Sequence, residues 1–120
     1  MFNFFNKTKA VIKHGAIDQN TRCSLLKEFQ AGSHRILVTT DSMTRGLDMQ
    51  KVSLVINFDT PENTDEYIQR VGRVGGFGKG GGVAITFVSE NKFVESLKKY
   101  CDSNISELPL DVKLIFEKSF

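Results

Sequence analysis

Short apolar runs alternate with amphipathic stretches along the chain, and this alternation predicts its secondary structure. Each run has the length and the β-branched or aromatic content of a strand. The runs lie at residues 9–13, 35–39, 52–58 and 83–88, and helical patterns occupy residues 19–30, 64–72 and 89–100. Because strands that alternate with helices form βαβ units with right-handed crossovers, the sequence predicts an α/β fold with a mostly parallel sheet and helices on both faces.

Capping residues mark the ends of these helices. Asp18 stands before the first helix as an N-cap, and Ala31-Gly32 stops it. Before the second helix, Asn63 and Glu66 have the spacing of a capping box, with Asn in place of Ser or Thr. Ser89 is the expected cap of the last helix. The helix boundaries are therefore predicted from local chemistry.

Polar residues directly follow the predicted strands. His14-Gly15 follow the first strand, Thr40-Asp41 the second and Asp59-Thr60 the third. The second strand, residues 35–39, is apolar at consecutive positions, as expected where both faces are buried. In open parallel sheets, ligands bind outside the carboxyl ends of the strands. Any binding site is therefore expected among these polar residues.

Composition and charge exclude several classes of protein. With 120 residues, 40% hydrophobic and 25% charged, the chain has the size and make-up of one globular domain. Its net charge of +2 is too small to indicate nucleic-acid binding by itself. Cys23 and Cys101 belong to no metal-ligand cluster or disulfide framework, so we expect no metal site. Without a membrane span or a signal peptide, an intracellular protein of the nucleus or cytoplasm is expected.

The stretch from Thr40 to Asp48 is the first candidate for binding chemistry. After the end of a strand, Thr40 and the nearby backbone N–H groups are suited to hold a phosphate. Arg45 and Asp48 bracket a tight turn at Gly46. An ordinary loop in which Arg45 and Asp48 form an internal ion pair explains the same residues, so both interpretations stay open.

Arg70 and Arg73 are the second candidate. They are three residues apart and lie on neighbouring positions at the carboxyl end of one helix. Two planar, permanently charged guanidiniums are suited to face a triphosphate and to stabilise the charge that develops in phosphoryl transfer. The structural alternative is that these cations relieve the unpaired carbonyls of the helix end.

Arg22 and the glycine-rich segment 75–82 carry less information. Arg22 lies in the first turn of a helix, where N–H groups and a guanidinium converge as in a phosphate site. The glycine-rich segment predicts a mobile loop. Because it precedes a strand and does not open a helix, it is not a dinucleotide-binding or Walker loop.

The motifs also follow one another in a characteristic order. They read His-Gly, Gln-x-x-Arg, Thr-Asp-(x)3-Arg-Gly-Leu-Asp, Asn-Phe-Asp-x-Pro, Tyr-Ile-Gln-Arg-x-Gly-Arg and Ala-Ile-Thr-Phe. Over about residues 9–90 this order resembles the second, C-terminal RecA-like lobe of DEAD-box RNA helicases. Within that family, residues 84–89 and 104–109 look most like the translation-initiation and mRNA-export branches.

The resemblance implies contacts with RNA and with a second lobe. Gly15, Arg22 and Thr40 would touch the sugar-phosphate backbone of single-stranded or short duplex RNA. Such contacts are largely independent of base sequence. The implied protein partner is the first RecA-like lobe, in cis or in trans.

The resemblance also implies a share of an ATP site. Asp48, close to Gly46, would hold the ribose, and Arg73 would approach the γ-phosphate. Arg70 would couple this lobe to the acidic motif of the first lobe. Mg²⁺ would be held mainly by the first lobe, so no metal ligand is expected in this chain.

The chain departs from the family's pattern in its length and in its arginines. It lacks the Walker loop and the Asp-Glu-Ala-Asp motif of the first lobe, and we expect the first strand–helix unit of its own lobe to be missing. Gln69 replaces a histidine, and Gly76 replaces the second arginine of the finger pair. An arginine finger contributes on the order of 10³–10⁵ in rate, and Lys79 lacks the planar fork that would replace it.

Two hypotheses of different classes follow. In the first, residues 1–120 are a partial helicase lobe, with a motif-bearing core at about 9–102 and a tail at 103–120, that is inactive alone. In the second, the chain is a non-enzymatic RNA- or helicase-binding module from a truncated or degenerate paralogue. Gly76 favours the module, whereas Thr40, Asp48 and Arg73 favour the helicase lobe. A purely structural α/β fold with coincidental motifs is the third alternative.

Overall fold

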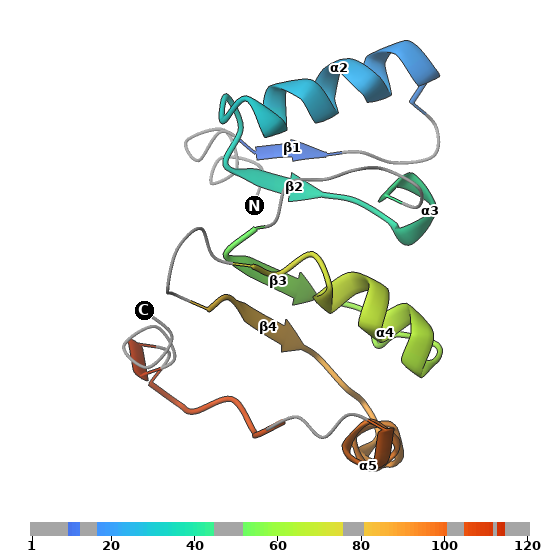
Figure 1. Cartoon of the computed structure of the whole chain (residues 1–120), viewed down its shortest axis with the longest axis vertical. Coiled ribbons are helices and arrows are strands. Elements are labelled where there is room, and N and C mark those ends of the chain that lie inside the picture. The colour runs from blue at the N-terminus through green and yellow to red at the C-terminus, as the bar shows by residue number, and fades with distance from the viewer. Residues whose placement is uncertain are drawn as a thin grey trace. The chain divides into compact units, whose positions relative to one another are not determined.

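The computed structural model of the chain describes most of the motif-bearing core. The described residues are 10–12, 17–44, 52–75, 81–100, 105–111 and 113–114. The chain divides into two compact units, Met1–Gln50 and Lys51–Phe120, and each contains its own pair of parallel strands (Figure 1). The parallel βαβ organisation predicted from the sequence is thus present in both units.

The first unit is a βαβ unit followed by a short helix. Strand β1 (Ala10–Ile12) pairs in parallel with β2 (Ile36–Val38), and α2 (Gln19–Gln30) forms the crossover between them (Figure 1). Helix α3 (Asp41–Thr44) begins soon after β2. All three elements predicted here from sequence are confirmed, whereas the short α3 was not predicted.

Helix α2 begins and ends at the residues that the sequence predicts. The Asp18 carboxylate accepts a hydrogen bond from the backbone N–H of Thr21 at 3.0 Å and another from the Thr21 hydroxyl. At the other end, Ala31 is the C-cap, and Gly32 has a φ of 80°. This left-handed conformation suits glycine because it has no Cβ. Local capping chemistry therefore determines both ends.

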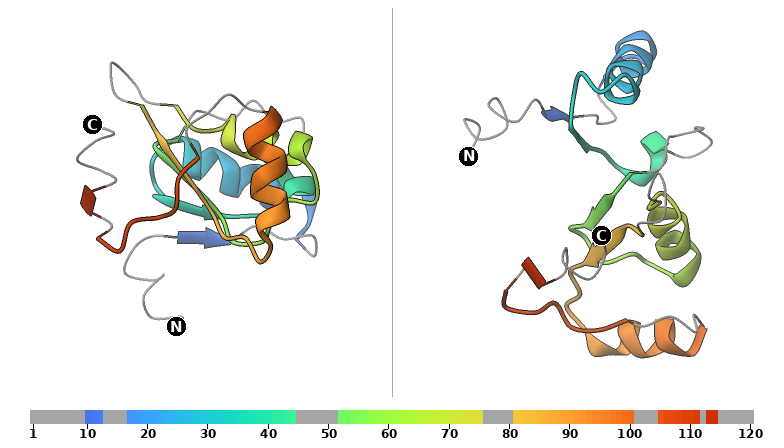
Figure 2. Two further views of the ribbon diagram at one scale, coloured as in Figure 1. Left: turned by 90° about the horizontal axis from the view of Figure 1, so that it is seen from below. Right: turned by 60° about the vertical axis from the view of Figure 1, so that its left-hand side comes forward.

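The second unit repeats the βαβ arrangement. Strand β3 (Leu54–Asn57) pairs in parallel with β4 (Val83–Thr86), and α4 (Thr64–Val71) forms the crossover. Helix α5 (Asn91–Tyr100) follows β4, and the views of Figure 2 show both helices of this unit from other sides. The rings of Tyr67 and Phe93 meet edge to face, with their centroids 6.4 Å apart, and join α4 to α5.

Helix α4 has the predicted N-cap but a modified capping box. The Asn63 Oδ1 accepts from the Glu66 backbone N–H at 2.9 Å, as predicted. The Glu66 carboxylate accepts from the backbone N–H of Glu62 at 2.6 Å, one residue before the partner in the standard motif. In α5, the prediction that Ser89 is the cap is wrong, because the helix begins at Asn91 and Glu90 directly precedes it.

Burial is sparse among the described residues. Leu26 and Leu97 are the buried hydrophobic side chains there, and Asn57 is the buried polar one. Val38 is 43% exposed, so the expectation that β2 is buried on both faces is not met at its end. Phe58, directly after β3, is 80% exposed. Consecutive apolar residues in a strand report its tendency to be buried, but the cover itself comes from packing that the local pattern does not specify.

Candidate functional site

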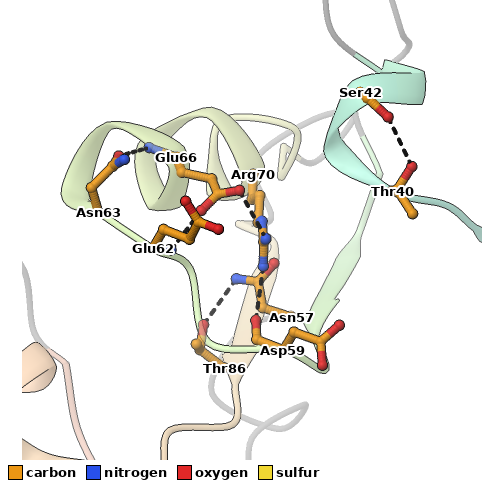
Figure 3. A network of polar contacts seen from close by, with 9 residues as sticks. All are labelled: Thr40, Ser42, Asn57, Asp59, Glu62, Asn63, Glu66, Arg70 and Thr86. Atoms are coloured by element: carbon orange, nitrogen blue, oxygen red, sulfur yellow. Dashed lines mark hydrogen bonds and ion pairs between the residues drawn. The ribbon is translucent and has the colours of Figure 1, made fainter.

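Thr40 lies two residues after the end of β2, in the turn that the sequence predicts to bind phosphate. Its side chain is exposed, and its hydroxyl lies 3.2 Å from the hydroxyl of Ser42 in α3 (Figure 3). Two hydroxyl groups at the carboxyl end of a strand both donate and accept hydrogen bonds. Ser42 was not singled out from the sequence, although its position two residues after Thr40 was available as a signal.

Arg22 lies in the first turn of α2 and is partly turned back onto its own chain. Its Nη2 donates to the backbone carbonyl of Ile17 at 3.3 Å. Its Nε is buried and has no hydrogen-bond acceptor among the described residues. A buried donor without an acceptor is unfavourable by about 1–3 kcal/mol. The Arg22 guanidinium is therefore incompletely satisfied within the unit that contains it.

Arg70 lies near the carboxyl end of α4 and contacts two groups of its own unit. Its Nη1 donates to the backbone carbonyl of Asp59 at 2.8 Å, and its Nη2 donates to Glu66 Oε1 at 3.2 Å (Figure 3). The side chains of Arg70 and Glu66 are only 18% and 19% exposed. The predicted guanidinium at this helix end is thus fixed against the loop that follows β3.

Arg73 follows the C-cap of α4, and its main chain is held against the start of β3. The Arg73 carbonyl accepts a hydrogen bond from the backbone N–H of Val52 at 2.9 Å. Val74 then forms a parallel bridge with Val52, and the Gly75 N–H donates to the Val52 carbonyl at 2.9 Å. The structure therefore brings Arg70 and Arg73 to one helix end, as their spacing predicts, and anchors that end to the sheet.

A polar pair, formed by the buried Asn57 and the half-buried Thr86, joins the carboxyl ends of β3 and β4. The Asn57 side-chain amide donates to the Thr86 hydroxyl at 2.9 Å, and Asn57 is only 4% exposed (Figure 3). The Thr60 hydroxyl donates to the Phe87 carbonyl at 2.9 Å. Asn57 belongs to a motif noted in the sequence, but its cross-strand role depends on a partner 29 residues away and was not predicted.

Several predicted site residues lie outside the described part of the chain. These are Gly15, Gly46, Asp48 and Gly76, together with Arg45 and Lys79. Among the described residues, no group of three or more His, Cys, Asp or Glu side chains is arranged to hold a metal ion. Within the same residues, no helix combines the length and apolar character needed to cross a membrane.

Comparison with known proteins identifies the class to which this fold and these motifs belong. Residues 1–78 match the model of the helicase conserved C-terminal domain. Eukaryotic initiation factor 4A of Caenorhabditis elegans is 48% identical over 98 residues, which are 80% of this chain and 24% of the relative. The same factor of Zea mays is 46% identical over 82% of this chain and 24% of its own length. The chain therefore spans about a quarter of the curated relatives that it matches.

Solved structures agree with this assignment. The C-terminal domain of the DEAD-box protein Dbp5 superimposes with a TM-score of 0.77 at 31% identity, over 98% of this chain and 73% of that domain. The yeast DEAD-box splicing factor Prp28 gives 0.72 at 33% identity, over 96% of this chain and 27% of that protein. Saccharomyces cerevisiae Dbp5 bound to RNA and ADP BeF3 gives 0.74 at 31% identity, over 98% and 34%. The chain belongs to the helicase C-terminal domain family and has the RecA-like fold of the DEAD-box C-terminal lobe.

Proposed function

We propose that residues 1–120 act as a partial second lobe of an ATP-dependent RNA helicase and are inactive without a first lobe. The observation that carries this proposal is the anchored end of α4, where the Arg70 guanidinium is held by the Asp59 carbonyl and the main chain of Arg73 is hydrogen-bonded to Val52. Fixed guanidiniums stabilise charge in phosphoryl transfer because they need no reorganisation at the moment of reaction. ATP, with Mg²⁺ held mainly by the first lobe, is the cofactor that this chemistry requires.

For the ATP site, the proposal assigns one role to each residue. Arg73 approaches the γ-phosphate, while Asp48 and the neighbouring Gly46 hold the ribose. Arg70 couples this lobe to the acidic motif of the first lobe. None of these residues supplies an adenine-reading group or a Walker loop, so the site is incomplete without the first lobe.

For RNA, the proposal rests on Arg22 and Thr40, with Gly15 as a third contact. A phosphate oxygen would give the buried Nε of Arg22 the acceptor that it lacks among the described residues. The exposed hydroxyl of Thr40 is suited to a second phosphate or to a ribose hydroxyl. Because these groups address the backbone, the lobe would bind single-stranded or short duplex RNA with little base preference.

ATP hydrolysis by the chain joined to the first lobe of a DEAD-box helicase tests this function. We expect RNA-stimulated turnover from the joined protein and none from the 120-residue chain alone. Arg73→Lys keeps the charge but removes the planar fork, and we expect it to lower turnover without changing RNA affinity. Turnover by the isolated chain, or an Arg73→Lys protein as active as the original, would contradict the proposal.

Gly76→Arg tests whether the missing second arginine limits catalysis. In the joined protein we expect ATP turnover to rise, because a finger contributes on the order of 10³–10⁵ in rate when it is correctly placed. Gly76→Lys is the control, since it adds the charge without the fork. If neither substitution raises turnover, the loop and not the absent guanidinium limits the reaction.

A non-enzymatic module that binds RNA or a helicase partner is the second candidate function, and Gly76 is the residue that favours it. Under this alternative the isolated chain binds RNA without nucleotide, and its affinity falls as salt rises, because phosphate contacts release counterions. RNA binding by the isolated chain that is lost in Arg22→Ala, combined with an inactive joined protein, would establish the module. Both functions place the protein inside the cell, in the nucleus or cytoplasm.

A further inference from the structure

Glu66 makes two contacts in the second unit, and the catalytic roles proposed above do not account for them. Its two carboxylate oxygens contact different groups. Oε1 lies 3.2 Å from Arg70 Nη2, and Oε2 accepts from the Glu62 backbone N–H at 2.6 Å. The same residue thus joins the entrance of α4 to a side chain at its carboxyl end (Figure 3).

The Glu66–Arg70 contact differs from an ordinary surface ion pair in its shielding. Side chains four residues apart on an exposed helix gain little from pairing, because water screens them. Here both side chains are less than a fifth exposed, at 19% for Glu66 and 18% for Arg70. Hydrogen bonds between charged groups in such surroundings are strong and directional.

The contact also limits where the Arg70 guanidinium lies. An arginine side chain has several rotatable bonds and considerable rotamer freedom. The Asp59 carbonyl accepts from Nη1 at 2.8 Å, while Glu66 holds Nη2. These two acceptors, one in the loop after β3 and one on α4, restrict both the position and the plane of the guanidinium.

We propose that Glu66 is a positioning residue that presents the Arg70 guanidinium at the carboxyl end of β3. This inference rests on the proposed function, in which Arg70 couples the two lobes. Glu66 itself touches neither ATP nor RNA in this account. Its carboxylate holds Arg70 in place before the first lobe binds. Closure of the two lobes then does not have to order the Arg70 side chain.

A simpler role for Glu66 is to stabilise the start of α4, since carboxylates near a helix N-terminus are favourable. Asp65 provides the matched control. It lies in the same first turn, carries the same charge and is exposed. Asp65→Asn and Glu66→Gln therefore remove one charge each from the same turn, but only Glu66→Gln changes the acceptor of Arg70.

The first test measures the Arg70 side chain in the 120-residue chain by NMR of the ¹⁵N-labelled guanidinium. We expect Glu66→Gln to speed the rotation and hydrogen exchange of the Arg70 group, and Asp65→Asn to leave both unchanged. Glu66→Asp retains the charge but shortens the reach, and we expect it to behave like Glu66→Gln. Preserved amide signals of β3 and α5 show that each variant is folded. An Arg70 signal that responds equally to Glu66→Gln and Asp65→Asn would overturn the inference.

The second test measures ATP turnover of the chain joined to a first lobe. We expect Glu66→Gln to reduce kcat by about tenfold to 100-fold with little change in KM, the size expected for a displaced catalytic group. In an Arg70→Ala background, Glu66→Gln should cause no further loss, because it acts through Arg70. An additional loss there would overturn the positioning role. A joined protein that hydrolyses no ATP at all would refute the proposed function instead, while the NMR result still decides the contact.

Discussion

Arg22 in the first unit and Arg70 in the second are both candidate functional arginines, yet they are held in different ways. Arg70 donates to a carboxylate and to a backbone carbonyl of its own unit. Arg22 makes a longer bond to the Ile17 carbonyl, at 3.3 Å, and its buried Nε lacks an acceptor among the described residues. The Arg70 guanidinium is thus held by contacts within its own unit, whereas under the proposed function a ligand would complete the contacts of Arg22.

The backbone near Arg70 is also held by contacts between distant residues, whereas the backbone near Arg22 is held by a local contact. The end of α4 near Arg70 is fixed to the segment just before β3 by the hydrogen bonds that Val52 makes with Arg73 and Gly75. The start of α2 near Arg22 is fixed by its own Asp18 cap, which is a local contact. A guanidinium that stabilises developing charge benefits from a rigid support, and one that follows an RNA backbone benefits from freedom to adjust.

The support of α4 can be broken at Gly82. A Cβ there would overlap Val74 Cγ1 and lie 3.0 Å from the Ser53 carbonyl oxygen. We expect Gly82→Ala to lower the free energy of unfolding by about 3 kcal/mol, the upper range for overpacking against backbone. Gly81→Ala is the control, because a Cβ at Gly81 meets nothing within 4 Å. Urea unfolding followed by circular dichroism measures both, and equal stabilities would show that the bridge tolerates the added atom.

Removal of each arginine tests the comparison itself. We expect Arg70→Ala to lower the free energy of unfolding by about 1–3 kcal/mol, because it leaves the shielded Glu66 carboxylate without this cation. Arg22→Ala should change it by no more than about 0.5 kcal/mol, since an unsatisfied donor disappears together with its contacts. The same unfolding experiment measures both variants. Equal losses would contradict the distinction between an arginine that is placed and one that awaits a ligand.

RNA affinity should show the opposite order. We expect Arg22→Ala to weaken RNA binding uniformly across sequences and to reduce the slope of log affinity against log salt by about 1, as for the loss of one phosphate contact. Lys27→Ala removes an equal charge from the last turn of the same helix and should leave that slope nearly unchanged. A titration with fluorescent single-stranded RNA measures both variants. A larger effect of Lys27→Ala would place the RNA on another part of α2.

The smallest expected effect concerns the caps. The hydrogen bond from the Thr21 hydroxyl, followed by the one from the Thr21 backbone N–H, lowers the pKa of Asp18 below its usual value of 3.8. Such a carboxylate stabilises the folded state above its unfolded pKa, and this contribution is lost as pH falls through the lower folded pKa. Asp18→Asn gives α2 an uncharged cap like Asn63 of α4. We expect the stability advantage of the original chain over Asp18→Asn to decline once the pH falls below about 3.8, and to disappear below the lower pKa of the folded state. A constant difference from pH 6 to pH 3 would contradict the role of the Asp18 charge.

The parts of this structure that the sequence predicts are those determined by neighbours along the chain. Helix α2 spans Gln19–Gln30 as predicted, because Asp18 and Gly32 mark its ends within a few residues. Arg70 and Arg73 share a helix end because their spacing requires it. The family assignment likewise followed from the order of short motifs and is confirmed.

The parts that the sequence does not predict depend on contacts between distant residues. The cross-strand bond from Asn57 to Thr86 and the exposure of Phe58 belong to this group. So does the double contact of Glu66, whose sequence signal indicated only a capping box. The wrong prediction for Ser89 has a different cause. The sequence indicated Ser89 as the N-cap of the last helix, but α5 begins at Asn91, so Ser89 lies one residue too early to be its cap.

The residues on either side of the glycine-rich segment are hydrogen-bonded to two adjacent residues just before β3. The Gly75 N–H donates to the Val52 carbonyl, and the Val83 N–H donates to the carbonyl of the next residue, Ser53. Because both anchors are backbone hydrogen bonds to neighbouring residues, we expect an insertion between residues 75 and 81 to leave the register of β4 and the main-chain position of Arg73 unchanged. A reporter peptide inserted there is therefore expected to leave the pairing of β3 with β4 intact.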